Sequence, residues 1–152
     1  MNLKLSKIWY IMFWIYFVFL MAVSFLEISF YAPIFIFNLS DVHHNYIPFD
    51  TIRTYLFNFN HYNFDTWLYN TFGVVFLFIP LGFLLPSAFI NVKSNRTVVL
   101  ISLSVSMFIE VLQRVTNLGV FDIDDMILNT IGAAVGYWIY KSISKKGSYT
   151  VI

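Results

Sequence analysis

Four apolar stretches constrain the fold of this chain more than any other feature, because each is long enough to cross a lipid bilayer as a helix. A transmembrane helix needs about 20 apolar residues. The stretches cover residues 8–30, 67–89, 97–115 and 122–140. Lysines precede the first stretch, as they do in a signal peptide, but a signal peptide has a shorter apolar run of about 7–15 residues. We therefore expect four uncleaved spans.

The composition agrees with a membrane protein. Of 152 residues, 59% are hydrophobic and only 11% are charged, whereas soluble domains carry about 25% charged residues. A chain this short cannot bury so much apolar surface in water, which excludes a soluble enzyme, a disordered tail and a nucleic-acid-binding module. Cysteine is absent, so disulfides and thiol chemistry are excluded as well. We predict one all-α integral membrane domain over residues 1–152, a four-helix bundle with a long extracytoplasmic loop between its first two spans.

The charged residues orient this bundle. With four spans, most of the basic residues share one side: Lys4, Lys7, Lys93, Arg96, Lys141, Lys145 and Lys146. Basic residues favour the cytoplasmic side of a membrane, so both termini are expected in the cytoplasm. The other side receives all eight carboxylates, together with Arg53 and Arg114.

The expected outer loop, residues 31–66, contains a shorter pattern. Apolar residues follow helical spacing from Phe49 to Phe59, which indicates an amphipathic helix at the membrane surface, with Asp50 or Thr51 as its cap. The loop also holds the three histidines, His43, His44 and His61. Their spacing matches no metal motif such as HEXXH, so we expect exposed interfacial histidines and no metal site.

The third span ends in polar residues that share one helix face. Glu110, Gln113 and Arg114 stand at positions i, i+3 and i+4. A charge in the middle of a span costs about 2.5–3.5 kcal/mol on insertion scales, so such residues suggest a function. Two interpretations remain open: the Glu110–Arg114 pair only neutralises itself, or it also serves a site.

The fourth span begins with a second polar face. Asp122, Asp125 and Asn129 follow the spacing i, i+3 and i+7, while Asp124 points away from this face. Acidic residues at a helix N-terminus also stabilise the helix as caps or through its dipole. Capping accounts for Asp122 better than for Asp125, and it does not account for Asn129, which lies one turn deeper.

The spans contribute packing signals and one further polar group. Gly132 and Gly136 continue the polar face of the fourth span, a spacing typical of close helix packing. Pro80 kinks the second span and frees a backbone carbonyl. The second span also places Asn70 at the depth of the other polar groups. The predicted binding residues are therefore Asn70, Glu110, Gln113, Arg114, Asp122, Asp125 and Asn129, although a purely structural hydrogen-bond network would give the same pattern.

Several segments together resemble the VanZ-like family. These are NYIPFDTI, Asn70 followed by FIPLGFLLP, then IEVLQ and FDIDDMILNTIGAAVGY, and the resemblance extends from about Asn45 to Tyr140. Family members often carry an arginine shortly before the DxDD segment, where this chain has Gly119. The resemblance implies a multi-pass protein of the bacterial cytoplasmic membrane and cell envelope. It also implies a link to reduced susceptibility to glycopeptide antibiotics such as teicoplanin.

Three mechanisms fit these residues. In the first, which we favour, the chain is not an enzyme, and its outer polar layer binds an amphiphile, an envelope lipid or a partner membrane protein. A divalent cation bridging a phosphate to the acidic layer would be the one cofactor. In the second, Glu110 and Asp125 act as catalytic acid and base on a lipid-linked substrate, but the sequence shows no nucleophile. In the third, the polar layer only stabilises a structural subunit.

Overall fold

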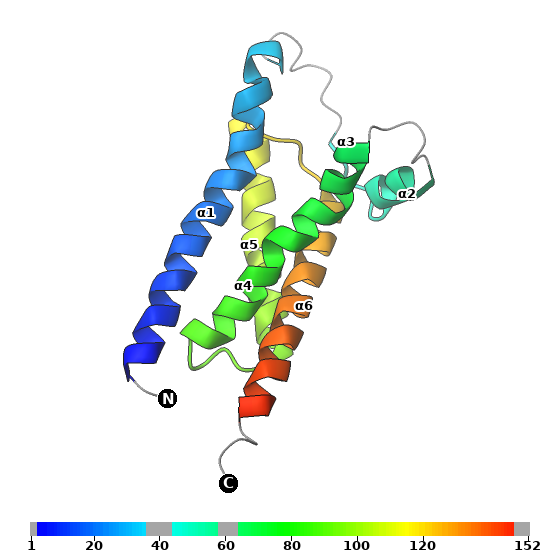
Figure 1. Ribbon diagram of the computed structural model, residues 1–152. Coiled ribbons are helices and arrows are strands. Elements are labelled where there is room, and N and C mark those ends of the chain that lie inside the picture. The colour runs from blue at the N-terminus through cyan, green and yellow to red at the C-terminus, as the bar shows by residue number, and fades with distance from the viewer. Residues whose placement is uncertain (1–2, 36–43, 58–63, 148–152) are drawn as a thin grey trace.

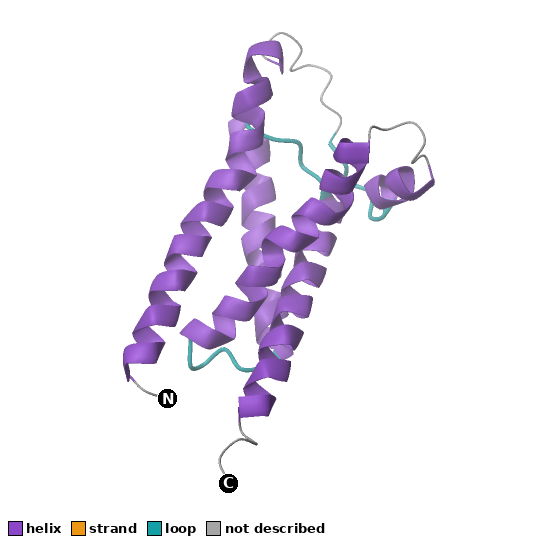
Figure 2. Cartoon of the chain, viewed as in Figure 1, coloured by secondary structure: helices purple, strands orange, loops and turns teal. Residues whose placement is uncertain are grey.

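The computed structural model describes residues 3–35, 44–57 and 64–147, most of which form helices (Figures 1 and 2). In chain order these are α1 (Leu3–Phe35), α2 (Asp50–Phe57), α3 (Phe64–Leu68), the π-helical turn η3 (Tyr69–Gly73), α4 (Val74–Ala88), α5 (Asn95–Thr116) and α6 (Ile123–Gly147). The four long helices form one bundle in which α4 packs on α1, α5 and α6, while α2 lies at one end (Figure 1). The all-α prediction is confirmed for this part of the chain.

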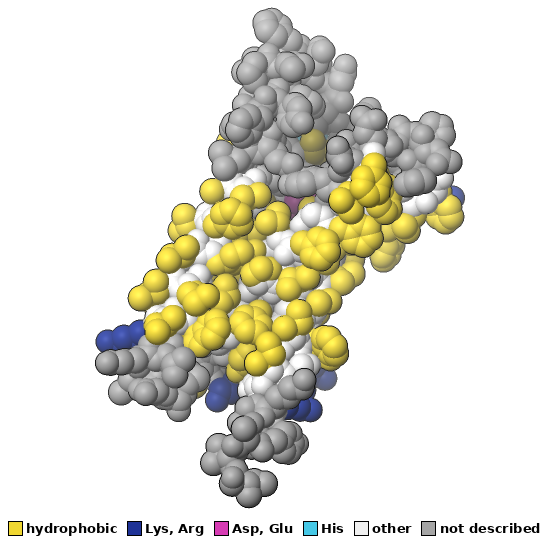
Figure 3. Space-filling view, in the orientation of Figure 1, with side chains coloured by type: hydrophobic (Ala, Val, Ile, Leu, Met, Phe, Trp, Pro, Cys, Tyr) yellow, Lys and Arg dark blue, Asp and Glu magenta, His cyan; other side chains and the backbone are white. Residues whose placement is uncertain are grey.

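Three helices within the described ranges are long and apolar enough to cross a membrane. Their candidate spans are Ser6–Phe25, Thr71–Ala88 and Asn95–Thr116. They correspond to the first three predicted spans, and side chains along the bundle present an apolar surface (Figure 3). Helix α6 runs along α4 and α5 but is not among the three, since it begins with acidic residues and carries lysines in its second half. A crossing by α6 therefore stays a prediction.

The helices extend beyond the predicted spans, because a helix continues outside the hydrocarbon layer until a residue stops it. The first was expected over residues 8–30, but α1 runs from Leu3 to Phe35. The second, expected over 67–89, continues an unbroken helical path from Phe64 through the π turn η3. Helix α1 thus covers the first five residues of the segment predicted as a loop, and the expected amphipathic helix is present as α2. His43 and His61 lie outside the described residues.

The closest helix contact joins α4 to α6, and glycines make it. A Cβ atom added at Gly132 would lie 2.2 Å from the Val75 carbonyl oxygen, and one added at Gly136 would lie 1.9 Å from that of Ile79. From the opposite side, a Cβ added at Gly82 would lie 1.9 Å from the Ala133 carbonyl oxygen. The predicted packing role of the α6 glycines is confirmed. This contact fixes α6, whose first turn carries Asp124 and Asp125, against α4.

Helix α1 is joined to α4 through the turn that precedes Pro80. The Tyr16 hydroxyl on α1 donates a hydrogen bond to the Leu77 carbonyl of α4. At the end of the bundle where the termini lie, the Tyr137 hydroxyl donates to the Lys93 carbonyl at 2.7 Å. Buried polar hydrogen bonds of this kind fix the relative positions of helices in an apolar bundle.

Candidate functional site

The backbone joins the start of α6 to the segment that precedes α2. The Asn45 N–H donates to the Phe121 carbonyl at 2.9 Å, and the Ile123 N–H donates to the Asn45 carbonyl at 3.1 Å. These bonds form an isolated parallel bridge between Asn45 and Asp122. Next to them, the Phe121 N–H donates to Nδ1 of His44 at 3.1 Å. Two of the segments that carry the family resemblance therefore meet at one end of the bundle.

Asp122 caps α6 and also binds the incoming segment. Its Oδ1 accepts the Asp124 N–H at 2.8 Å, the usual bond of an N-cap residue. The same oxygen accepts the Asn45 amide at 2.8 Å, and Oδ2 accepts the Thr51 hydroxyl at 2.6 Å. Of the two interpretations of Asp122, the structure supports capping.

As expected, Asp124 does not share the helix face of Asn129. Its carboxylate is nevertheless fully buried, with 0% of the residue's surface exposed. Its Oδ1 accepts the Phe49 N–H at 2.5 Å, and its Oδ2 accepts the Ile52 N–H at 3.0 Å. These amides belong to the N-terminus of α2. The prediction that Asp50 or Thr51 caps this helix is therefore wrong, because a carboxylate from α6 occupies the capping position.

We call the four side chains Asn45, Thr51, Asp122 and Asp124 the outer latch. The Asn45 amide lies at its centre, 2.9 Å from the Thr51 hydroxyl oxygen, 2.8 Å from Oδ1 of Asp122 and 3.4 Å from Oδ2 of Asp124. Each of the two carboxylates accepts several hydrogen bonds, which compensates for removing its charge from water. The outer latch thus holds α2 on the N-terminus of α6.

Glu110 connects the third long helix to this region. Its side chain is only 3% exposed, and Oε2 accepts the Asp122 N–H at 2.8 Å. Arg114, one turn further along α5, is exposed and, in the described part of the chain, forms no ion pair with Glu110. The interpretation of Glu110 and Arg114 as a self-neutralising pair is therefore not supported. Glu110 instead anchors the start of α6 to α5.

A second polar layer lies deeper in the bundle. Ser102, Ser106 and Glu110 stand four residues apart on the buried face of α5, and we call them the polar stripe. The Asn129 amide of α6 donates to the Ser106 hydroxyl at 2.8 Å. Among the described residues, however, Oδ1 of Asn129 and Oγ of Ser102 are buried without a hydrogen-bond partner. The deeper layer is therefore only partly paired, in contrast to the outer latch.

The remaining predicted residues are placed less centrally. Gln113 turns toward α1, where its amide donates to the Ser24 carbonyl at 2.9 Å and its Oε1 is buried without a partner in the described part of the chain. Asp125 is half-buried in the first turn of α6. The side chain of Asn70 lies outside the described residues. The structure thus joins Glu110 of α5 to Asp122 at the start of α6, whereas Asn129 bonds to Ser106, one turn away from Glu110 on α5.

Arg114 and His44 interact through their charges. The pKa of His44 is lowered from 6.5, first by partial burial and second by the positive charge of Arg114. The hydrogen bond from the Phe121 N–H to Nδ1 needs the same neutral form of the imidazole. His44 is therefore a structural acceptor at the start of the bridging segment rather than a simple exposed interfacial histidine.

Helix α2 presents an apolar face away from the outer latch. Phe49, Leu56 and Phe57 are 61%, 59% and 80% exposed, and the exposed Arg53 stands among them at helical spacing. The opposite face, with Ile52 and Tyr55, is half-buried toward the bundle. This pattern is typical of a helix in the interfacial layer of a membrane, where apolar side chains reach the acyl region and a cation stays near the head groups. The predicted position of α2 at the membrane surface stays a prediction.

Sequence reasoning missed Asn45, Thr51, Asp124, Ser102 and Ser106. Asn45 and Thr51 belong to the NYIPFDTI segment, and Asp124 belongs to the DxDD segment. Their positions inside segments that carry the family resemblance could have marked them as candidate site residues. The two serines recur at the spacing that places them on the Glu110 face. Within the described ranges, no group of three or more His, Asp or Glu side chains is placed to hold a metal ion.

Comparison with known proteins gives one match. The family model VanZ/LLP1 matches residues 7–144. No curated protein and no solved structure matches the chain. The matched region contains the outer latch, the polar stripe, the whole of α4 and α5, and nearly all of α1 and α6. The chain therefore belongs to the VanZ/LLP1 family.

Proposed function

We propose that this chain is a cell-envelope protein that lowers susceptibility to glycopeptide antibiotics such as teicoplanin by binding an amphiphile at its outer end. The observation that carries the proposal is the unequal pairing of the two polar layers. Structural networks pair nearly all of their buried polar atoms, as the outer latch does. Asn129 Oδ1 and Ser102 Oγ, by contrast, can each take part in a further hydrogen bond, and they lie deeper in the bundle than the buried Glu110.

The ligand has a head group that donates hydrogen bonds and an apolar tail. The amide oxygen of Asn129 and the carboxylate of Glu110 both accept hydrogen bonds. Hydroxyl or ammonium groups of the head group can therefore donate to them. The tail lies along the exposed face of α2, formed by Phe49, Leu56 and Phe57. Helix α2 covers the acidic layer, and the ligand enters when the outer latch opens. A divalent cation takes part only if the head group carries a phosphate.

The topology belongs to the same proposal. Helix α6 is the fourth span of a multi-pass protein of the bacterial cytoplasmic membrane, and both termini are cytoplasmic. In support, α6 runs the length of the bundle beside α4 and α5 (Figure 1). Basic side chains gather at the end where the termini lie, as Figure 3 shows, whereas the outer latch lies at the opposite end. The positive-inside rule places that basic end in the cytoplasm.

The test compares carboxylates that differ in burial. Glu110→Gln keeps the volume and an oxygen that can accept the Asp122 N–H, but it removes the charge. We expect normal membrane abundance and thermal stability, with loss of the teicoplanin tolerance that the parent gives to a strain lacking the gene. Asp125→Asn should act in the same way. The matched control, Asp50→Asn, removes a charge from the exposed first turn of α2 and should keep tolerance.

If Glu110→Gln and Asp125→Asn keep full tolerance at normal membrane abundance, both carboxylates have only a structural role. The proposal would then be wrong. Loss of tolerance in the Asp50→Asn control would also contradict it, because overall outer charge rather than the buried site would then govern the phenotype.

A further inference from the structure

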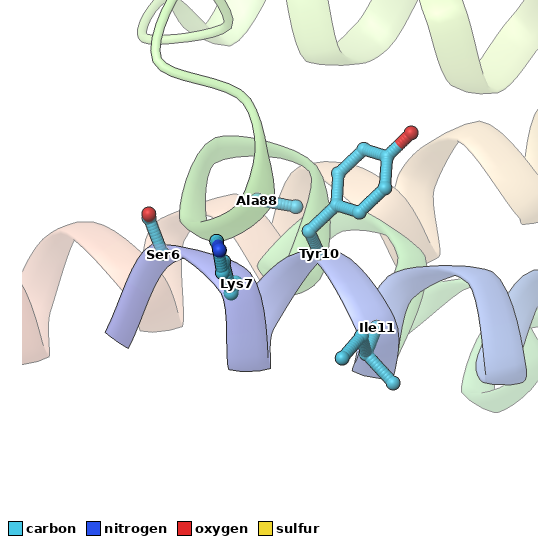
Figure 4. Close-up of a pocket in the computed structure, with 5 residues that line it drawn as sticks. All are labelled: Ser6, Lys7, Tyr10, Ile11 and Ala88. Atoms are coloured by element: carbon cyan, nitrogen blue, oxygen red, sulfur yellow. The ribbon is translucent and has the colours of Figure 1, made fainter. Parts of the chain in front are cut away.

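A groove lies at the opposite end of the bundle, between the start of α1 and the end of α4. Its volume is about 300 Å³, and it is lined by Ser6, Lys7, Tyr10, Ile11 and Ala88. Figure 4 shows the Lys7 side chain directed from α1 toward the end of α4 near Ala88. The volume is at the lower end of the range of small-molecule sites, enough for part of one lipid.

The shape of the groove follows from how α4 ends. After Ala88 the backbone of Phe89 becomes extended, and the helix stops. The Phe89 ring packs on Tyr10 and Phe13 of α1, with ring centroids 5.7 and 4.9 Å apart. The small side chain of Ala88 leaves space beside these rings. The result is a mostly apolar recess, bounded by Tyr10 and Ile11, with one lysine at its edge.

The charge at this end is positive and unbalanced. The described carboxylates, Asp50, Glu110, Asp122, Asp124 and Asp125, all belong to the far end of the bundle. Lys7 lies near the start of α1, at the same end of the bundle as the α4–α5 turn with Lys93, the start of α5 with Arg96 and the second half of α6 with Lys141 (Figure 1). A lysine beside an apolar recess, without a described carboxylate nearby, is complementary to an anionic group that carries an acyl chain.

We propose that this groove binds an anionic phospholipid of the surrounding leaflet. The lipid phosphate pairs with the Lys7 ammonium group, and the first part of one acyl chain lies against Tyr10, Ile11 and Ala88. Basic recesses between transmembrane helices on the cytoplasmic side hold anionic head groups in this way. The site is separate from the outer end and does not depend on the function proposed there.

The experiment is a lipid titration of the full-length protein in neutral detergent, read by native mass spectrometry. The probes are phosphatidylglycerol and phosphatidylcholine with identical acyl chains. We expect the parent to prefer phosphatidylglycerol by about fivefold, the factor that corresponds to about 1 kcal/mol per basic residue near an anionic bilayer. Lys7→Gln should bring the ratio close to one, and Lys7→Arg should restore it. Ile11→Asn, at an exposed position of the apolar wall, should weaken both lipids alike.

A matched control, Lys141→Gln, removes one charge from the same end and should keep the preference. Three results would overturn the inference: equal affinity of the parent for both lipids, an unchanged preference in Lys7→Gln, or full displacement of phosphatidylglycerol by inorganic phosphate. The last result would assign a site for free anions instead of a lipid. Neither lipid nor phosphate binding here bears on the tolerance phenotype of the Glu110 variants.

Discussion

Replacing Gly136 with alanine should force apart two helices whose backbones touch. The added Cβ would lie 1.9 Å from the Ile79 carbonyl oxygen and 2.9 Å from the Phe83 nitrogen. Carbon–oxygen contacts at helix interfaces normally measure about 3.3–3.6 Å, so α4 and α6 must separate by more than about 1 Å. Overpacking costs about 1–3 kcal/mol, and we expect the upper end because the opposing atoms are backbone atoms that cannot change rotamer.

Thermal unfolding in detergent measures this loss. A chain of this length loses about 2–4 °C in melting temperature per kcal/mol, so Gly136→Ala should melt about 6–12 °C below the parent. Gly82→Ala meets the Ala133 carbonyl at the same 1.9 Å and should show a similar loss. Ala22→Val, at an exposed position of α1, is the control and should melt like the parent. If Gly136→Ala also melts like the parent, α4 and α6 are not in backbone contact and the reasoning fails.

Three further outcomes are expected. Asp124→Asn leaves only one side-chain oxygen to accept the N–H groups of Phe49 and Ile52. Losing a helix cap costs about 1 kcal/mol, so the backbone amides of α2 should exchange hydrogen about fivefold faster, and unchanged exchange would refute the capping role. The lowered pKa of His44 means that the folded state favours its neutral form, so its contribution to stability is present above pH 6.5 and is lost as the pH falls below that value. Between pH 7.5 and 5.5 the parent should therefore lose more melting temperature than His44→Asn, and equal losses would contradict this. In the cysteine-free chain, Val120→Cys should react with an impermeant thiol reagent on intact cells while Asn91→Cys should not, and the reverse pattern would invert the topology.

The sequence was sufficient for the features that depend on local spacing. Runs of apolar residues predicted the three candidate spans that the structure contains. The interval between Gly132 and Gly136 predicted a close helix contact, which the structure places against α4. The ends of the helices were predicted less well, because hydropathy marks where the hydrocarbon layer stops and not where the helix does.

The candidate site was only partly predictable, since its bonds join residues far apart in the chain. Helical spacing predicted one polar face that contains Glu110 and another that contains Asp122 and Asn129, but it could not show that Glu110 accepts the Asp122 N–H. Helical spacing also led us to leave Asp124 out of the predicted binding residues, because its side chain does not share the helix face of Asp122, Asp125 and Asn129. Its partners are amides of α2, a helix whose position relative to α6 no local pattern encodes.

The outer latch also dictates an order of events during synthesis. Asn45 and Asp122 are 77 residues apart, and α4 and α5 are made between them. Because a chain emerges from the ribosome with its N-terminal residues first, α2 exists well before the carboxylate that caps it. Until the start of α6 has been made, the first amides of α2 have no partner from Asp124. The outer latch can therefore close only after α5 and the first turn of α6 have been made, and its closure marks the arrival of α6.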